Sequence, residues 1–393
     1  MKTTSWTLLF PLSTFLLFDF VQLNIMSVLS PYLIQKLSLS TQQLGFLSSL
    51  FFWVDCALLI PAGIVLDRYS IQWLVILSIS IALLGIFIFM LSPSWKTALI
   101  WRASSGITGA FGYLSCIKMI STYFPSHQQG ILIGGTGMVI MLAGVITQYP
   151  VQQIAIHYGL SMVFVIDIFF GLTTNLVLWL SKGRSCSLSP ILTQASSHKA
   201  CPYKQKYNWL LAFYACLINL PLFVLGALWG NLYLKTIYHF SLIDSSFITS
   251  MIFIGNMLGA PLLGFMSDKF KKRSFLMLVI AVVYFFNFIA ILFVQTASFV
   301  LFTVLFFLLG FCSGAQTLSY AAVIEHNIDF NTAKSTSLLS LLSVGGGAVG
   351  QCIFGKLIGE NNSYQKGVIF LIISASLCMM ISMYISYEGR SKK

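Results

Sequence analysis

The chain alternates between long apolar stretches and short polar connections. We count twelve stretches of about 20 or more predominantly apolar residues. A stretch of this length spans the hydrocarbon core of a bilayer as an α-helix, which pairs its backbone polar groups within one segment. The expected spans are residues 7–33, 42–66, 72–92, 97–122, 129–153, 160–181, 208–235, 243–266, 274–294, 298–323, 334–357 and 366–387.

One connection differs from the others. Residues 182–207 form a longer segment, rich in Ser and basic residues, that separates six spans from six. It has no apolar periodicity, so we interpret it as a cytoplasmic tether rather than a regulatory domain. The sequence therefore predicts two six-helix bundles, residues 1–181 and 208–393, joined by this loop.

Composition supports an all-α integral membrane protein. Apolar residues make up 58% of the chain and charged residues 8%, with a mean hydropathy of +0.89. Soluble domains carry roughly 25% charged residues. The short connections leave no room for a soluble catalytic domain, and no phosphate-binding loop, zinc-protease motif or nucleophile elbow occurs. The eight Cys residues have no metal-ligand spacing. We therefore expect no enzyme activity, cofactor or metal.

The net charge of +12 follows membrane topology. With the N-terminus inside, 15 of the 22 Lys and Arg residues fall on the inner side, 5 fall outside, and 2 lie within the fourth span. Cytoplasmic loops carry such an excess of Lys and Arg. This pattern predicts cytoplasmic termini and no nucleic-acid partner. The expected location is a bacterial inner membrane.

The ends of spans two and eight repeat one pattern, in which a Gly precedes an Asp by four residues and a basic residue follows. The matching residues are Gly63, Asp67 and Arg68 in the first copy and Gly264, Asp268 and Lys269 in the second. Two copies about 200 residues apart indicate a duplicated membrane unit.

This pattern resembles the loop 2–3 signature of the major facilitator superfamily (MFS), Gly-x-Leu-a-Asp-Arg-x-Gly-Arg-Lys. The first copy departs from the signature on its basic side, at residues 70–72, where it reads Ser-Ile-Gln. The second copy has Lys-Lys-Arg at residues 271–273. A second MFS motif, Arg-x-x-x-Gly-x-x-Gly, resembles the segment that contains Arg102, Gly106 and Gly109 in span four. The resemblance implies two pseudo-symmetric six-helix bundles that transport a solute by alternating access.

The resemblance also implies a gate at the cytoplasmic side. Gly63 and Gly264 would let a neighbouring helix approach closely. Each signature Asp would face the positive N-terminal end of a helix in the opposite bundle. The expected partners of Asp67 are at residues 335–336, and those of Asp268 are at residues 128–129. The alternative is an ordinary helix end with solvated charges.

Buried charges provide the candidate chemistry. Asp19 and Asp55 lie about 12 and 13 residues into their spans, and Arg102 lies about one turn into span four. A charged side chain at such depth must pair, face water or become neutral. The two acids are candidates for proton coupling, or for a static Asp–Arg pair. Arg102 is a candidate ligand for a substrate carboxylate, unless it snorkels to the surface. Asp167 in span six is a third, weaker candidate acid.

Other polar residues complete the predicted substrate site. Asn256 stands where the second half aligns with Asp55, so the charge occurs in one half only. Span seven is interrupted by Gly near its end, as in helices that line transporter cavities. The substrate-binding candidates are Arg102, Asp19, Asp55, Gln22, Trp229, Asn231, Asn256 and Gln316.

These residues predict a secondary active transporter that takes up a small zwitterionic or carboxylate nutrient, such as an amino acid, with protons. A looser resemblance, around Trp229-Gly230, to the phagosomal nutrient transporters of intracellular bacteria implies amino acids or nucleosides. One alternative is a proton-antiport exporter of amphipathic compounds, although span five lacks the Gly-Pro pair typical of drug–proton antiporters. Another is a non-transporting sensor. The expected partners are the solute, protons and the lipid bilayer, and the expected functional form is a monomer.

Overall fold

The computed structural model describes residues 2–181, 205–327, 332–359 and 363–391. Within these ranges the regular structure is helical and contains no strand. Eleven described helical stretches are long and apolar enough to cross a membrane. The remaining predicted span is the helix at residues 95–123, which carries Lys96, Arg102 and Lys118. The predicted all-α membrane fold is confirmed.

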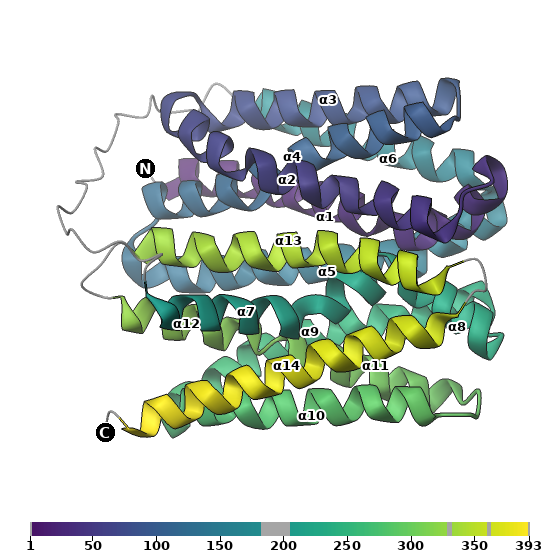
Figure 1. Cartoon of the computed structure of the whole chain (residues 1–393). Helices are drawn as coiled ribbons and strands as arrows, with labels where there is room; N and C mark the ends of the chain where they lie inside the picture. The colour runs from purple at the N-terminus through teal and green to yellow at the C-terminus, as the bar shows by residue number, and fades with distance from the viewer. Residues whose placement is uncertain (1, 182–204, 328–331, 360–362, 392–393) are drawn as a thin grey trace. The chain divides into compact units, whose positions relative to one another are not determined.

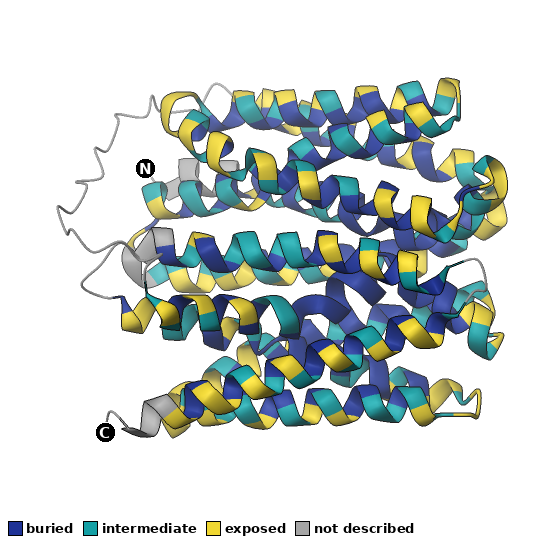
Figure 2. Ribbon diagram, in the orientation of Figure 1, coloured by how far each residue is buried: buried dark blue, intermediate teal, exposed yellow. Residues whose placement is uncertain are grey.

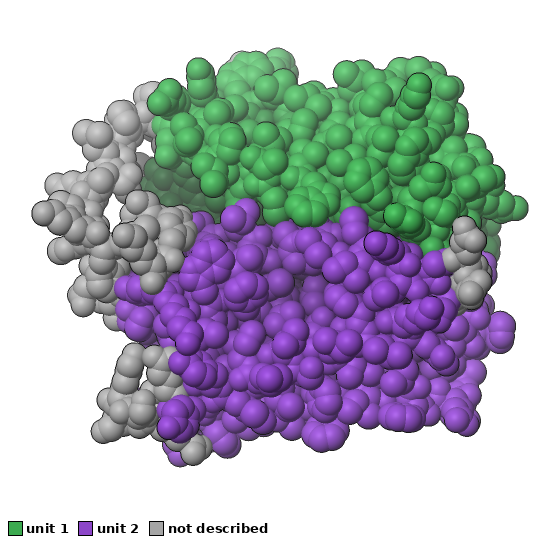
Figure 3. All heavy atoms as spheres, viewed as in Figure 1, with its two compact units in different colours: residues 1–192 green, residues 193–393 purple. Residues whose placement is uncertain are grey.

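The chain divides into two compact units, Met1–Leu192 and Thr193–Lys393 (Figure 3). Most of the predicted tether, residues 182–204, lies outside the described residues. The helices of the first unit, shown in Figure 1, are α1 (Lys2–Leu37), α2 (Thr41–Arg68), α3 (Ile71–Leu91), α4 (Trp95–Tyr123), α5 (Ser126–Tyr158) and α6 (Leu160–Leu180).

Short capped turns separate the helices of the first unit. Ser40, Ser70 and Ser94 each accept a backbone N–H from the third residue of the following helix. A Ser at this position satisfies a donor that the first helical turn leaves unpaired. Gly159 alone joins α5 to α6, with φ of 80°, a backbone conformation that glycine adopts readily.

The second unit repeats six spans, but two of them are interrupted. Span seven consists of α7 (Lys206–Pro221), a π-helical segment η3 (Leu222–Trp229) and α8 (Gly230–Tyr238). Span ten consists of α11 (Phe299–Ser313) and α12 (Gln316–His326). The other helices are α9 (Leu242–Phe270), α10 (Arg273–Phe293), α13 (Thr332–Ile358) and α14 (Tyr364–Ser391).

Two hydrogen bonds connect the π-helical segment to α13. Gln351 Nε2 donates a hydrogen bond to the Phe223 carbonyl oxygen at 2.8 Å, and Trp229 Nε1 donates to the Gln351 carbonyl oxygen at 3.3 Å. These bonds satisfy polar groups at a point where the helix departs from its regular pattern. In the most apolar 18-residue stretch of span seven, 83% of the residues are buried. The segment η3 is dark blue, the colour of buried residues, in Figure 2. The predicted interruption of span seven is therefore a deeply buried segment.

Equivalent glycines bring two helices together in each unit. A Cβ atom on Gly106 of α4 would lie 2.6 Å from the Phe51 carbonyl oxygen of α2. In the second unit, a Cβ on Gly310 of α11 would collide with the Ile252 carbonyl oxygen of α9. Both helix pairs therefore need a glycine at this position.

The glycines of the repeated signature do not act in this way. A Cβ atom on Gly63 or Gly264 would meet no atom within 4 Å. Within each unit, the close contacts occur near the middle of the helices instead. The expectation that Gly63 and Gly264 admit a helix of the opposite bundle stays a prediction.

Candidate functional site

Three Asp side chains and one Arg side chain are buried among the described residues of the first unit. Asp19 of α1 is 2% exposed, Asp55 of α2 is 8%, Arg102 of α4 is 0% and Asp167 of α6 is 5%. Arg102 therefore does not snorkel to the surface. The helices that carry these residues contact one another, since α4 packs against α1 and α2, and α6 packs against α1.

The two predicted coupling acids lie against a glycine face of α4. A Cβ atom on Gly112 would lie 2.5 Å from Asp19 Oδ2, and one on Gly109 would lie 3.0 Å from Asp55 Cγ. Glycines three residues apart share one face of a helix. This face therefore provides the space that both carboxyl groups occupy.

The two acids have few polar partners. Thr108 Oγ1 donates a hydrogen bond to Asp19 Oδ1 at 2.7 Å. Asp55 has no hydrogen bond or ion pair with any residue that the structure describes, and Asp19 has no ion pair with one. The static Asp–Arg pair that the sequence left open is therefore absent among the described residues.

Arg102 is held by backbone carbonyls instead of by an acid. Its Nη1 donates to the Gln22 carbonyl oxygen at 2.7 Å, and its Nη2 donates to the Ser48 carbonyl oxygen at 3.1 Å. Its guanidinium carbon lies 5.2 Å from the centroid of the Phe51 ring. Within the described residues, Nε has no hydrogen-bond partner. Arg102 thus connects α4 to α1 and α2, and its Nε–H is left without a partner among the described residues.

Gln22 connects three helices. Its Nε2 donates to both oxygens of Asp167, at 2.6 and 2.7 Å, and its Oε1 accepts from Ser105 Oγ at 3.3 Å. Together with the Arg102 bond, these contacts join α1, α4 and α6. The sequence offered Gln22 and Asp167 as separate polar residues. The two are 145 positions apart, and no local signal pairs them.

The candidates in the second unit are uncharged. Trp229 and Asn231 are fully buried, and Asn256 is 8% exposed. Gln316 Nε2 donates to Ser343 Oγ at 3.1 Å, which connects α12 to α13. Asn256 makes no hydrogen bond with any described residue. The described acids of this unit lie at helix ends: Asp244 and Asp268 on α9 and Glu325 on α12.

The two predicted coupling acids, Asp19 and Asp55, each align with an Asn in the second unit. Asn256 follows Asp55 by 201 residues, and Asn219 follows Asp19 by 200. The ends of span one and span seven, Leu37 and Tyr238, are 201 residues apart. The separation between equivalent residues therefore grows from 200 to 201 between Asn219 and Tyr238, the stretch that contains η3. A π turn holds one more residue than an α turn, which accounts for the extra residue. Asn256 was the expected counterpart of Asp55, whereas Asn219 was not predicted as the counterpart of Asp19.

The signature acids at the helix ends have partners within their own units. Asp67 Oδ1 lies 2.7 Å from Lys118 Nζ, which also donates to the Leu66 carbonyl oxygen. Asp268 Oδ1 lies 2.8 Å from Arg273, and Arg273 lies 2.6 Å from Glu325 Oε1. Lys118 thus joins α4 to α2 and does not simply snorkel. The predicted contacts between opposite bundles remain predictions.

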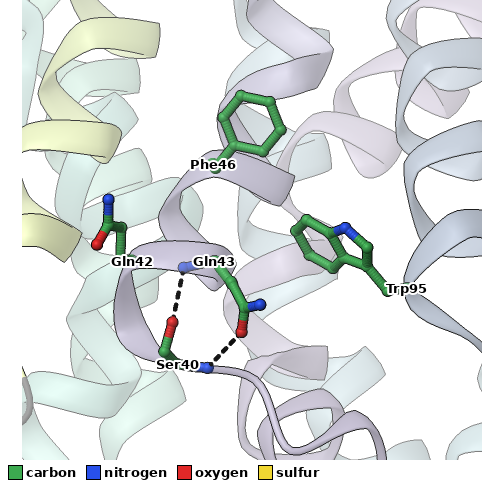
Figure 4. A pocket seen from close by; sticks show the side chains of 5 residues that line it. All are labelled: Ser40, Gln42, Gln43, Phe46 and Trp95. Carbon is green, nitrogen blue, oxygen red and sulfur yellow. Dashed lines mark hydrogen bonds between the residues drawn. The ribbon is translucent and has the colours of Figure 1, made fainter.

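A surface pocket in the first unit is not a site of this kind. Figure 4 shows a pocket of about 570 Å³ lined by Ser40, Gln42, Gln43, Phe46 and Trp95. Ser40 and Gln43 cap each other through bonds of 3.2 and 2.9 Å, so these polar groups serve the start of α2. Among the described residues, no group of three or more His, Cys, Asp or Glu residues could hold a metal ion.

The family model described as Major Facilitator Superfamily matches residues 12–350 and 210–393. The chain belongs to the Major Facilitator Superfamily. This confirms the predicted family, and the chain is a multi-pass membrane protein from a superfamily of small-molecule transporters.

Three curated relatives show low sequence identity to this MFS chain. The hexuronate transporter of Bacillus subtilis is 24% identical, over 92% of this chain and 90% of the relative. The membrane sensor protein UhpC of Escherichia coli is 21% identical, over 86% and 81%. Its namesake from Salmonella typhimurium is 22% identical, over 61% of this chain but only 59% of the relative.

Solved structures show the same fold. A bacterial homolog of the human lysosomal transporter Spinster, inward-facing and unoccupied, gives a TM-score of 0.78 at 15% identity and covers 98% of both chains. The occupied form gives a TM-score of 0.72 at 17% identity and covers 98% of this chain and 96% of the other. At these identities the likeness shows the fold alone.

Proposed function

We propose that this MFS protein takes up a small carboxylate or zwitterionic solute together with protons, and that Asp19 and Asp55 carry the protons. The main support is the isolation of Asp55, which is buried and has no partner among the described residues. An ionised carboxylate in an apolar interior costs several kcal/mol unless it is paired. The neutral carboxylic acid avoids this cost, so Asp55 is suited to alternate between a protonated closed state and an ionised state in contact with water.

Arg102 supports a carboxylate-bearing solute. A guanidinium has five N–H donors, and Arg102 donates hydrogen bonds to two backbone carbonyls. In the proposed cycle, a solute carboxylate displaces one or both carbonyls and forms the stronger charge-assisted pair. The name of the relative from Bacillus subtilis agrees with this class, since a hexuronate carries a carboxylate. An amino acid would also place its ammonium group near Asp19 or Asp55.

The remaining parts of the proposal concern orientation and assembly. The Lys and Arg distribution supports cytoplasmic termini, and a bacterial inner membrane is the proposed location. Asp67, Arg68, Asp268 and Lys269 would form the cytoplasmic gate between the bundles, and the monomer would be the functional form.

Uptake into proteoliposomes tests this function. Purified protein would first be screened by thermal shift against sugar acids, amino acids and nucleosides, because a bound solute raises the apparent stability. Labelled solute would then be offered with and without an imposed pH gradient. We expect accumulation to depend on the gradient, and the direction of solute movement relative to the protons distinguishes uptake from proton-antiport export.

Asp55→Asn should abolish accumulation but retain solute exchange. Asp244→Asn, which neutralises an acid at the start of α9, should retain both.

A sensor is the second candidate, because two of the three relatives are named membrane sensor proteins. A sensor with this fold would bind the solute, and the solute would raise its melting temperature. It would show neither uptake nor exchange in the same proteoliposomes. Binding without exchange would therefore favour the sensor over the carrier.

A further inference from the structure

The second unit contains a pocket at the ends of several helices. Its volume is about 610 Å³, and it lies where the start of α7, the turn from α9 to α10, and the ends of α12 and α14 meet. Among the residues that line it are Tyr207, Lys271, Lys272, Arg273, Phe275 and His326. This pocket is separate from the buried polar residues described above.

The turn from α9 to α10 concentrates positive charge at this pocket. Lys271 ends α9 in a left-handed conformation with φ of 52°, and α10 begins two residues later at Arg273. Arg273 pairs with both Asp268 and Glu325, so these three side chains together carry one negative charge. Lys271 and Lys272 are exposed and have no acidic partner among the described residues. The five charged side chains therefore carry a net charge of +1, and the two lysines are the cations without an ion-pair partner.

An apolar track leads away from the pocket along α10. Phe275, Val279, Val283 and Phe286 are 48%, 39%, 41% and 60% exposed. Their spacing of four, four and three residues places them on one face of the helix. Exposed residues recur along α10 in Figure 2. Because α10 spans the membrane, this face is available to acyl chains, and the pocket at its end lies at the depth of the lipid headgroups.

We propose that this pocket binds the headgroup of an anionic phospholipid. Its phosphate would lie between Lys271 and Lys272, and one acyl chain would follow the α10 track that begins at Phe275. Basic pockets between transmembrane helices bind anionic headgroups by such contacts. The corresponding turn of the first unit, residues 70–72, carries no basic residue. The site would therefore be specific to the second unit, and it does not depend on which solute the protein carries.

Native mass spectrometry of the full-length protein tests this site. The wild type would be titrated with dioleoylphosphatidylglycerol, with dioleoylphosphatidylcholine and with inorganic phosphate. The test variant is Lys271→Gln/Lys272→Gln. The matched control is Lys36→Gln/Lys96→Gln, which removes two exposed lysines from the first unit, outside this pocket.

We expect the first phosphatidylglycerol to bind the test variant roughly 20- to 30-fold more weakly than the wild type, at about 1 kcal/mol for each lysine. The control should bind it within about twofold of the wild type, and phosphatidylcholine should not distinguish the three proteins. Equal affinity of wild type and test variant for phosphatidylglycerol would overturn the proposal. Competition by inorganic phosphate at concentrations similar to the lipid would also overturn it, by showing a free-anion site.

Discussion

The two units share a scaffold but differ in the chemistry of their interiors. Each has a helix pair held together at an equivalent glycine, Gly106 in α4 and Gly310 in α11. In the first unit the buried positions hold Asp19 and Asp55, and in the second they hold Asn219 and Asn256. Packing that serves the fold is thus present in both copies. Among the described residues, buried Asp and Arg side chains occur in the first copy alone, which we propose performs the proton chemistry.

A second contrast follows from the same alignment. Arg102 is fully buried in the first unit, and the matching position of the second unit, 204 residues later, holds the buried Phe306. An Arg can bind a carboxylate, whereas a Phe fills the same space without charge. The first unit therefore holds both the acids and the cation of the proposed site.

The largest effect is expected from making the two units alike. The double variant Asp19→Asn/Asp55→Asn replaces both acids with the amides of the second unit. A gradient of two pH units can drive about 100-fold accumulation with one proton per solute, since each unit corresponds to about 1.36 kcal/mol. We expect the variant to accumulate solute no further than equilibration. Undiminished accumulation would remove both acids from the coupling mechanism, and the two single variants would show which acid matters more.

Arg102→Lys should have the next largest effect. A lysine keeps the charge, but its single ammonium group cannot reproduce the paired geometry by which Arg102 reaches the Gln22 and Ser48 carbonyls. We expect a loss of roughly 1–3 kcal/mol in stability from the broken buried contacts. Thermal unfolding would measure this loss, with Lys96→Met, an exposed change on the same helix, as the control.

The same variant separates two roles of Arg102. If it binds the solute carboxylate, affinity for carboxylate solutes should fall more than tenfold, while affinity for neutral analogues changes little. An equal loss for both kinds of solute would indicate that Arg102 serves only to hold α1, α2 and α4 together.

A smaller effect is expected from filling the space next to Asp19. Gly112→Ala adds a methyl group 2.5 Å from Asp19 Oδ2, so the carboxyl group must move. We expect transport to slow by roughly tenfold, since a displacement of a reacting group by about 1 Å can lower a rate by up to about 100-fold. Gly134→Ala on α5 is the control, because a Cβ there meets no atom within 4 Å. Initial uptake rates measure both, and similar rates in the two variants would contradict the proposed placement of Asp19.

The smallest effects are expected at the helix ends. Lys118→Met removes an ion pair with Asp67, whose side chain is 76% exposed, and exposed pairs contribute less than about 1 kcal/mol. Arg273→Met removes two ion pairs from a side chain that is 17% exposed, so its effect on the unfolding temperature should be larger. The reverse order would show that the first unit depends more on its helix-end charge than the second.

The fold was largely predictable because its signals are local. Apolar stretches of about 20 residues predict spans, and the structure has long helices at all twelve of them. The buried acids were also predictable, since an Asp inside an apolar span is rare and costly. Their partners were not. The bonds from Arg102 to backbone carbonyls, and from Gln22 to Asp167, join residues 54 to 145 positions apart and depend on helix rotations that the sequence does not specify.

The π-helical segment shows a different limit. Counting residues at a fixed repeat aligns Asp55 with Asn256 but misses Asn219 by one position, because η3 holds an extra residue.

The glycines of the repeated signature show a third limit. Their position was predicted, but close packing occurs at Gly106 and Gly310, because close contact is made where helices cross.

Solute-driven proton uptake tests the central claim most directly. Proteoliposomes with a trapped pH-sensitive dye and no imposed gradient would receive the solute found in the thermal-shift screen. The account predicts that the lumen acidifies as the solute enters through the wild-type protein, and that it does not acidify with Asp19→Asn/Asp55→Asn. Equal acidification by both proteins, or solute entry through the wild type without acidification, would contradict it.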